Sequence, residues 1–241
     1  MAIEWHKSTL LRVEQCTPLT RRFWFEVHGT DGFEFKPGQF VTFDLPIGEK
    51  PKDRWRSYSI ASPPNGTNEF ELVIVLVPDG GGTNYLFQHS QPGTEIMFRG
   101  PVGKFVLPQV IENELCFVCT GTGIAPFRSM LLDLKNNPRP TRDIHLVFGT
   151  RTMDDVLYHE EMQSLAAQLP QLKYHITLSR EVPPEWSGYR GYVHAVYEEL
   201  FSDKRPADFY LCGWKNMIDE GRERIAAMGY DRKHIHMELY G

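Results

Sequence analysis

The residue pattern of this 241-residue chain changes near residue 108, and this change constrains the fold more than any other feature. Before it, short segments alternate apolar and polar residues, as Phe23, Phe25 and Val27 do in RRFWFEVH. Similar segments are GQFVTFDL, RWRSYSIA, EFELVIVLV and TEIMFRG, each bounded by Pro or Gly. Strict alternation without a helical period is typical of half-buried strands. Five or six such strands are typical of a small barrel, and residues 1–108 are predicted to form a six-stranded antiparallel β-barrel.

Residues 109–241 follow a different pattern, in which apolar strands alternate with helical segments. The four strands are ELCFVCT, DIHLVFGT, KYHITLSR and DFYLCG, and each is followed by a helix-forming segment. This alternation predicts an α/β domain with a parallel sheet covered by helices on both faces. Sheets of this kind bind ligands beyond the carboxyl ends of their strands, so functional residues are expected there.

Composition excludes several classes of protein. Hydrophobic residues make up 41% of the chain and charged residues 24%, and no apolar run approaches the roughly 20 residues that span a bilayer. We therefore expect no membrane insertion. The start MAIEWHKSTLLRVEQ has no signal-peptide pattern, which predicts a cytoplasmic location. A net charge of −5 argues against nucleic-acid binding.

Two of the four cysteines, Cys116 and Cys119, lie close together in sequence. Positions three apart on a strand point to opposite faces, so this pair is interpreted as core rather than as a metal site or a disulfide. The spacing of a plant-type iron–sulfur site is absent. Two histidines, His234 and His236, share one face of a predicted strand, but a third metal ligand is not evident, and no metal is predicted.

A glycine-rich turn, Thr120-Gly121-Thr122-Gly123-Ile124-Ala125-Pro126, follows the first strand of the second part. Glycines allow close approach of a ligand to the backbone, and a helix N-terminus attracts phosphate. A phosphate cradle and a plain turn both fit this segment taken alone.

Polar residues also follow the other strands. Arg151 ends the second strand, Ser179 and Arg180 end the third, and Cys212 and Gly213 end the fourth. A lone surface arginine is usually solvated, but two arginines and a serine on adjacent strand ends predict a site for the 2′-phosphate of NADP. Further along the chain, Arg190 adds a charge, and Tyr192 adds a ring that can stack on adenine.

The first part contains PDGGGTNYLF and RSYS. The three glycines fit either a flexible hairpin loop or a nest of backbone amides for an anion. If they hold a phosphate, Arg56 is its counter-charge and Tyr58 stacks on an attached ring. Otherwise RSYS is a strand whose polar residues face water, and Ser57 stays unassigned in both cases.

As a set, these segments resemble the ferredoxin–NADP reductase family, closest to its plant-type branch. RSYSIAS resembles the R-x-Y-S flavin motif, GGGTNYL resembles G-x-x-S/T-x-x-L, and GTGIAPFRS resembles the NADP pyrophosphate loop. SRE resembles the 2′-phosphate motif, CGWKNM resembles C-G-x-x-x-M, and HMELYG resembles the Glu-x-Tyr terminus. The matches run in order from about Pro37 to Tyr240.

The resemblance implies an FAD-binding barrel, an NADP-binding second domain and a set of site residues. Arg56 would bind the FAD pyrophosphate, Tyr58 would pack on the isoalloxazine ring, and Ser59 would bond near N5. The other expected FAD contacts are Val73, Gly81, Gly82, Thr83, Thr122 and Tyr240. The expected NADP(H) contacts are Thr120, Gly121, Gly123, Arg151, Ser179, Arg180, Arg190, Tyr192, Cys212, Gly213 and Met217. The resemblance gives Ser59, Cys212, Glu238 and Tyr240 catalytic roles.

Those roles predict a flavoenzyme that moves electrons between NADPH and a separate carrier, ferredoxin or flavodoxin. Tyr240 would cover the flavin face where nicotinamide must lie, Cys212 would line that position, and Glu238 would link the flavin to solvent protons. Gly241 extends past the family's terminal tyrosine, and Thr83 stands where many relatives have serine. We expect a monomer.

Two alternatives remain open from the sequence. One is an NAD(P)H-dependent flavin reductase or the reductase component of an oxygenase system, with NADH as donor. The other is a non-catalytic flavin- or nucleotide-binding subunit. The negative net charge bears on the acceptor, because a basic docking surface for an acidic ferredoxin would have to be local. Lys50, Lys52, Arg54 and Lys104 either form such a patch or are separately solvated.

Overall fold

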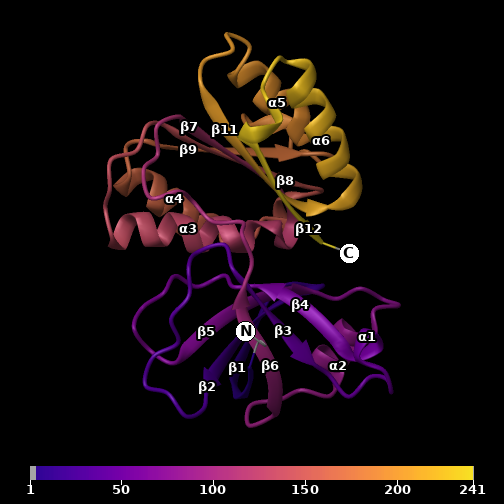
Figure 1. Cartoon of the computed structure of the whole chain (residues 1–241). Coiled ribbons are helices and arrows are strands. Elements are labelled where there is room, and N and C mark those ends of the chain that lie inside the picture. The colour runs from indigo at the N-terminus through magenta and orange to yellow at the C-terminus, as the bar shows by residue number, and fades with distance from the viewer. Residues whose placement is uncertain (1–3, 241) are drawn as a thin grey trace. The chain divides into compact units, whose positions relative to one another are not determined.

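The computed structural model describes residues 4–240, and these divide into two compact units. The first unit comprises the chain up to Val106 together with Ala125–Asp133, and the second comprises Leu107–Ile124 and the chain from Leu134 onward. Figure 1 shows the elements of both units. Among residues 4–240, none of the helices is both long enough and apolar enough to span a membrane.

The first unit is built on a six-stranded antiparallel sheet in the order β4-β3-β6-β1-β2-β5. A bridge between Ile60 and Leu72 joins the two ends of this order, so the sheet closes as the predicted barrel. The strands are β1 (Trp5–Thr17), β2 (Thr20–Val27), β3 (Phe40–Asp44), β4 (Trp55–Ser59), β5 (Glu69–Val75) and β6 (Glu95–Val102), and the helices are α1 (Pro51–Arg54) and α2 (Gly81–Gln88).

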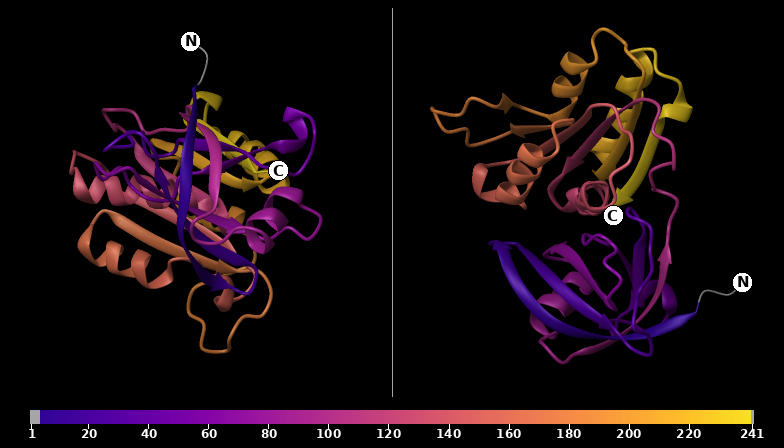
Figure 2. Two further views of the ribbon diagram at one scale, coloured as in Figure 1. Left: turned by 90° about the horizontal axis from the view of Figure 1, so that it is seen from below. Right: turned by 90° about the vertical axis from the view of Figure 1, so that its left-hand side faces the viewer.

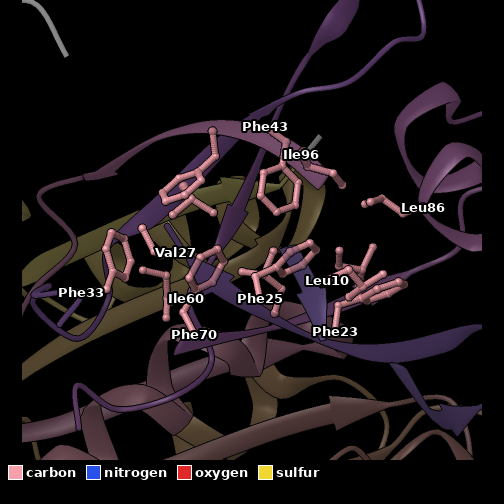
Figure 3. Packing of buried hydrophobic residues seen from close by; sticks show 14 of the residues in the cluster. Leu10, Phe23, Phe25, Val27, Phe33, Phe43, Ile60, Phe70, Leu86 and Ile96 are labelled. Carbon is pink, nitrogen blue, oxygen red and sulfur yellow. The ribbon is translucent and has the colours of Figure 1, made fainter. Parts of the chain in front are cut away.

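Aromatic side chains fill the barrel, as Figure 3 shows. The ring of Phe25 stacks on Phe70 at a centroid distance of 5.5 Å and meets the edge of Phe43 at 4.9 Å. Phe23, Phe25 and Val27 are fully buried or nearly so, as the predicted alternation requires, but Trp24 between them departs from it. Trp24 is only 7% exposed, and the guanidinium of Arg12 lies 3.8 Å from the centre of its ring. A rigid aromatic core of this kind fixes the strands that carry the predicted flavin residues.

The second unit contains a six-stranded, entirely parallel sheet in the order β10-β9-β8-β7-β11-β12. Its strands are β7 (Glu114–Thr120), β8 (Ile144–Thr150), β9 (Leu172–Leu178), β10 (Tyr189–Arg190), β11 (Ala207–Trp214) and β12 (Ile235–Tyr240). The helices that follow its strands are α3 (Ile124–Asn136), α4 (His159–Gln168), α5 (Val193–Leu200) and α6 (Lys215–Ala227). In Figure 1, α4 lies on one side of the sheet, and α5 and α6 lie on the other.

Cys116 belongs to the core formed under α5 and α6, while Cys119 is buried outside that cluster. Both thiols are free, as is the exposed Cys16. Burial raises the pKa of Cys119 well above its ordinary value, so the thiol stays protonated and behaves as an apolar side chain. The structure therefore gives these cysteines the core positions predicted from their spacing.

The middle of α3 packs against the barrel strands and is anchored there by buried polar contacts. The Arg128 Nη1 atom lies 3.0 Å from Glu71 Oε2 and donates to the Ala61 carbonyl at 2.8 Å. Glu71 also accepts from Arg22 Nε at 2.6 Å, so one buried carboxylate joins two guanidinium groups. Removing the carboxylate would leave two arginines without their shared partner, which is strongly destabilising in a buried setting.

Candidate functional site: two nucleotide cradles

Three predicted flavin residues meet at the start of helix α2. Arg56 and Tyr58 are two positions apart on β4, so they lie on the same face of the strand. Gly82, in the first turn of α2, packs directly against both of them. A Cβ atom at Gly82 would lie 2.7 Å from Arg56 Cγ and 3.1 Å from Tyr58 Oη, so only glycine fits there without displacing them.

This arrangement fits a phosphate group. Helix α2 begins at Gly81, and its N-cap Gly80 offers no side-chain cap, so the first amides of the helix have no capping side chain. A helix N-terminus with a guanidinium beside it attracts an anion through both backbone donors and charge. Arg56 Nη1 donates to the backbone carbonyl of Trp55 at 2.8 Å, which orients the group while leaving most of its N–H donors for a ligand.

The segment predicted as a glycine loop or nest is therefore a helix, and its own side chains explain why. Thr83 Oγ1 accepts from the amide of Val77 at 3.1 Å, and Asn84 Nδ2 donates to the carbonyl of Pro78 at 2.8 Å. These bonds fold the loop before α2 back onto the first turn. The sequence interpretation missed Asn84, although a Thr-Asn pair after the glycines is the composition expected of such a capping loop.

Ser59 and Val73, two further predicted flavin residues, lie in the barrel, whereas Thr122 and Tyr240 belong to the second unit. Burial raises the pKa of Tyr58 above its ordinary value, so its phenol remains neutral and its ring can serve as an apolar surface. Ser59 and Val73 are each 5% exposed. The Ser57 hydroxyl lies 2.9 Å from that of Thr42 on the other face of the strand. Ser57 thus has a structural partner, which accounts for its lack of an assigned role.

The second cradle is the turn between β7 and α3. Gly121–Gly123 form one turn of 3-10 helix, and Thr122 within it is buried. A Cβ atom at Gly123 would lie 2.2 Å from the carbonyl oxygen of Cys212, so the turn contacts the end of β11 backbone to backbone. Thr120 Oγ1 is buried and has no hydrogen-bond partner in residues 4–240. An unsatisfied hydroxyl at the mouth of such a turn fits a site that is completed by a polar ligand.

The end of β11 brings together three more predicted residues. Parallel pairing places Cys212 opposite Glu238 on β12, and Tyr240 forms a hydrogen bond with the Cys212 side chain. Burial is the main cause that raises the pKa of the Cys212 thiol, and the charge of Glu238 raises it further. The thiol is therefore neutral and acts as part of an apolar wall. Gly213 follows Cys212 in the chain, and a Cβ atom at Gly213 would lie 3.0 Å from Met217 Cε, so Met217 packs against this end of β11.

The residues predicted to bind the 2′-phosphate lie at the same carboxyl-terminal edge of the parallel sheet, at the ends of β8, β9 and β10. Beyond the ends of β8 and β9, the Arg180 amide donates to the Arg151 carbonyl at 2.9 Å, so the two arginines are neighbours. Arg190 ends β10, which pairs with the last residues of β9. The Ser179 hydroxyl donates to the Thr150 carbonyl at 3.2 Å.

The side chains around these arginines differ in what they contact. Arg151 forms an ion pair with Asp155, with Nε 3.2 Å from Oδ2. Arg180 and Arg190 are exposed and have no ion-pair partner within the described part of the chain. Tyr192 is 75% exposed, so its ring is free to stack on a flat group. Asp155 was not singled out in the sequence, although its i,i+4 spacing from Arg151 is a recognisable signal.

The structure gives partners to some residues of two features that the sequence left open. His234 Nδ1 lies 2.7 Å from Asp208 Oδ1, and His236 stacks on Tyr210 at 4.2 Å. Residues 4–240 contain no group of three or more metal-ligating side chains, and His234 ends a 3-10 turn rather than lying on the strand. Of the four possible patch residues, Arg54 is held by a bidentate pair with Asp44. Gly241 lies outside the described residues.

A β-barrel and a parallel α/β sheet, each with a glycine-containing turn that fits a phosphate, are the combination expected of a flavin- and nicotinamide-nucleotide-dependent oxidoreductase. The model for the oxidoreductase FAD-binding domain matches residues 7–107, and the model for the oxidoreductase NAD-binding domain matches residues 117–223. The two matches coincide with the two kinds of sheet that the structure contains.

Individual relatives give the same picture. Ferredoxin–NADP reductase B of Sorangium cellulosum is 36% identical over 97% of both chains. The glycine betaine monooxygenase reductase subunit of Chromohalobacter salexigens is 31% identical over 98% of this chain, which spans 64% of that relative's length. A ferredoxin NADP⁺ reductase from Neisseria gonorrhoeae has the same fold, with a TM-score of 0.82 at 23% identity and 98% of each chain covered.

The chain belongs to the ferredoxin–NADP reductase family of FAD-containing oxidoreductases. This confirms the family, the two-domain fold and the cofactor class predicted from the sequence motifs.

Proposed function

We propose that this protein oxidises NADPH and passes the electrons, through FAD, to a separate one-electron carrier protein, ferredoxin or flavodoxin. The observation that supports the proposal is the presence in one chain of two glycine turns whose surroundings fit a phosphate. One is Gly82 backed by Arg56 and Tyr58, and the other is the Gly123 turn beside the unsatisfied Thr120 hydroxyl. We also propose that the chain functions as a monomer and that its domains are 1–108 and 109–241.

FAD, when bound, accepts two electrons as a hydride and releases them singly. The chain's own residues bind, orient and exclude water. Arg56 and the start of α2 bind the FAD pyrophosphate, with Gly81, Gly82 and Thr83 lining it. Tyr58 supplies a neutral ring for one face of the flavin, and Ser59 supplies a hydroxyl near its N5 edge. Val73 and Thr122 add further contacts in the proposed FAD site.

The NADPH site is proposed along the strand ends of the parallel sheet. Thr120, Gly121 and Gly123 bind its pyrophosphate, and Ser179, Arg180 and Arg190 bind its 2′-phosphate. Tyr192 stacks on adenine. Cys212, Gly213 and Met217 line the place of the nicotinamide, where a neutral, buried thiol keeps water out. Hydride transfer requires the two rings at roughly 3–3.5 Å, so positioning is the main contribution of this wall.

Two residues of β12 complete the proposed site. Tyr240 covers the flavin until nicotinamide displaces it, and its hydrogen bond to Cys212 supports a location beside the nicotinamide. Glu238 lies opposite Cys212 on the neighbouring strand and is the only carboxylate of β12. It is therefore proposed to hold and exchange protons with solvent during turnover.

A second candidate function has a specific observation in its favour. The relative from Chromohalobacter salexigens is named as the reductase subunit of a monooxygenase, and the chain matches 64% of it. The ion pair of Arg151 with Asp155 also leaves fewer free charges for a 2′-phosphate than the sequence suggested. Both points are compatible with an oxygenase reductase or flavin reductase that uses NADH.

Steady-state kinetics with both donors test the choice. NADPH and NADH are compared as donors, with purified ferredoxins and flavodoxins, an oxygenase component and free flavin as acceptors. The proposal expects a higher kcat/KM for NADPH and for one of the carrier proteins. It also expects Arg180→Ala to lower the NADPH value and spare the NADH value. Equal use of both donors, unchanged by Arg180→Ala, favours the second candidate.

A further inference from the structure

The three arginines at the edge of the parallel sheet are not electrostatically equivalent. Arg151 contacts Asp155 in two places, with Nε 3.2 Å from Oδ2 and Nη2 3.4 Å from Oδ1. Arg180 and Arg190 have no carboxylate partner among residues 4–240. One of the three cations is thus already neutralised before any ligand arrives.

The position of Asp155 is fixed by the backbone turn that carries it. Its amide donates to the Thr152 carbonyl at 3.3 Å, and its Oδ2 atom accepts from the Thr152 hydroxyl at 3.2 Å. The Asp155 side chain is 25% exposed, compared with 52% for Arg151. The carboxylate is therefore the more firmly held member of the pair, and its position determines where the Arg151 guanidinium lies.

This pair occupies the part of Arg151 that a phosphate would use. A guanidinium binds phosphate or carboxylate best through two parallel N–H groups, and Asp155 takes both Nε and Nη2. The lining of the neighbouring hollow adds no further cation on the side of Asp155. A hollow of about 470 Å³ beside the turn is lined by Thr152, Met153, Asp154, Glu181, Val182 and Pro183, which include two carboxylates and no basic side chain. Figure 2 shows the segment that follows β9, in orange, extending beyond the sheet.

We propose that Asp155 is a specificity-determining residue that withholds Arg151 from the 2′-phosphate. Recognition of that phosphate then falls to Arg180 and Arg190, and the chain discriminates only modestly between NADPH and NADH. The proposal rests on the proposed function, because it concerns the same nucleotide site. It differs from the sequence-based expectation, in which Arg151 is itself a ligand of the 2′-phosphate.

Calorimetric titration of the purified, FAD-loaded protein with 2′,5′-ADP and with 5′-ADP measures the contribution of the 2′-phosphate directly, without turnover. In Asp155→Asn the side chain keeps its shape and its Oδ1 acceptor but loses its charge. The released guanidinium should tighten binding of 2′,5′-ADP by about two- to five-fold, the range expected for one partly exposed ion pair. Binding of 5′-ADP should stay within about two-fold.

Two further variants separate the specific pair from general charge. Asp154→Asn removes the same charge one residue away, from an exposed side chain that forms no ion pair with Arg151. It should leave the ratio of the two affinities unchanged. In the double variant Arg151→Gln/Asp155→Asn, the gain should disappear, because no guanidinium remains to be released.

The outcomes are distinct. A ratio unchanged or lowered in Asp155→Asn overturns the proposal, since Asp155 would then be neutral or would position Arg151 for the phosphate. An equal gain in Asp154→Asn also overturns it. If the wild-type protein binds neither ligand, the proposed nucleotide site itself fails. Binding of 5′-ADP with an unaltered ratio rejects only the role given to Asp155.

Discussion

Replacing Gly123 by alanine tests whether the nucleotide turn depends on backbone contact with β11. The added Cβ atom would lie 2.2 Å from the Cys212 carbonyl oxygen, 2.7 Å from its carbonyl carbon and 3.1 Å from Gly213 Cα. Ordinary contact begins at 3.4 Å, so the turn must move by 3.4 − 2.2, or about 1.2 Å, away from the strand end. All three neighbours are backbone atoms, and no side-chain rotation relieves the overlap.

The magnitude follows from the kind of overlap. Inserting one carbon into a packed site typically lowers the free energy of unfolding by about 1–3 kcal/mol. Because the neighbours here are backbone atoms that cannot rotate away, we expect a cost of about 3 kcal/mol. The movement also displaces the amides that are proposed to bind pyrophosphate. We therefore expect Gly123→Ala to lower the free energy of unfolding by about 3 kcal/mol and to weaken 5′-ADP binding by about ten-fold or more.

Urea denaturation followed by circular dichroism measures the first quantity, and calorimetric titration measures the second. Gly121→Ala is the matched control in the same turn. Its φ is +53° and a Cβ atom there meets no atom within 4 Å, so alanine should cost only about 1 kcal/mol through backbone strain. If Gly123→Ala costs no more than Gly121→Ala and keeps nucleotide affinity, the reasoning is refuted.

Three further predictions concern acid stability, flavin retention and donor choice. Burial is the main cause that lowers the pKa of His175 to about 4 from an ordinary 6.5. Because protonation then favours the unfolded state, stability is retained above pH 6.5 and falls by about 3 kcal/mol by pH 4. His175→Phe should flatten this loss in urea titrations at several pH values, and an unaltered pH dependence rejects the assignment. Gly82→Ala should lose more bound FAD than Gly81→Ala, measured as the flavin-to-protein ratio, because only the first meets Arg56 and Tyr58. Equal ratios would show that this contact does not shape the FAD site. Tyr240→Ser should raise kcat/KM for NADH. Unchanged NADH kinetics would show that Tyr240 does not cover the flavin.

The barrel and the sheet were predictable because their strands obey simple periods. β1 escaped notice even though it is the longest strand, at 13 residues. Its pairing with β2 shifts register between Leu10 and Arg12 and again between Gln15 and Thr17. Each irregularity breaks the alternation that identifies a strand, so the segment carries no clean pattern. β10 has only two residues, too few for any period to appear.

Helix α2 shows where local composition misleads. Three consecutive glycines indicate a loop, because glycine disfavours helix by about 1 kcal/mol relative to alanine. In the structure, the Val77 amide donates to Thr83 and the Asn84 side chain donates to the Gly80 carbonyl, while Leu86 is fully buried. These local bonds and the burial of Leu86 together outweigh the helix propensity.

The residue types of the candidate site and their places at the strand ends could be predicted from the sequence. The charge pairing of those residues could not. The structure brings Arg151, Arg180 and Arg190 together at adjacent strand ends, as their positions in the sequence suggested. The neutralisation of Arg151 by Asp155 depends on the geometry of a turn. The spacing of the two residues in the sequence allows this ion pair but does not establish it. The unsatisfied hydroxyl of Thr120 likewise depends on packing that no motif encodes.

Anaerobic mixing of the purified, FAD-loaded chain with NADPH tests whether this chain alone transfers hydride to its flavin. The visible absorbance of the flavin should bleach with one equivalent of NADPH, with no other protein present. Subsequent addition of an oxidised ferredoxin or flavodoxin should restore that absorbance as the carrier is reduced. Flavin that stays oxidised in the presence of excess NADPH and NADH would contradict the account and indicate a non-catalytic nucleotide-binding subunit.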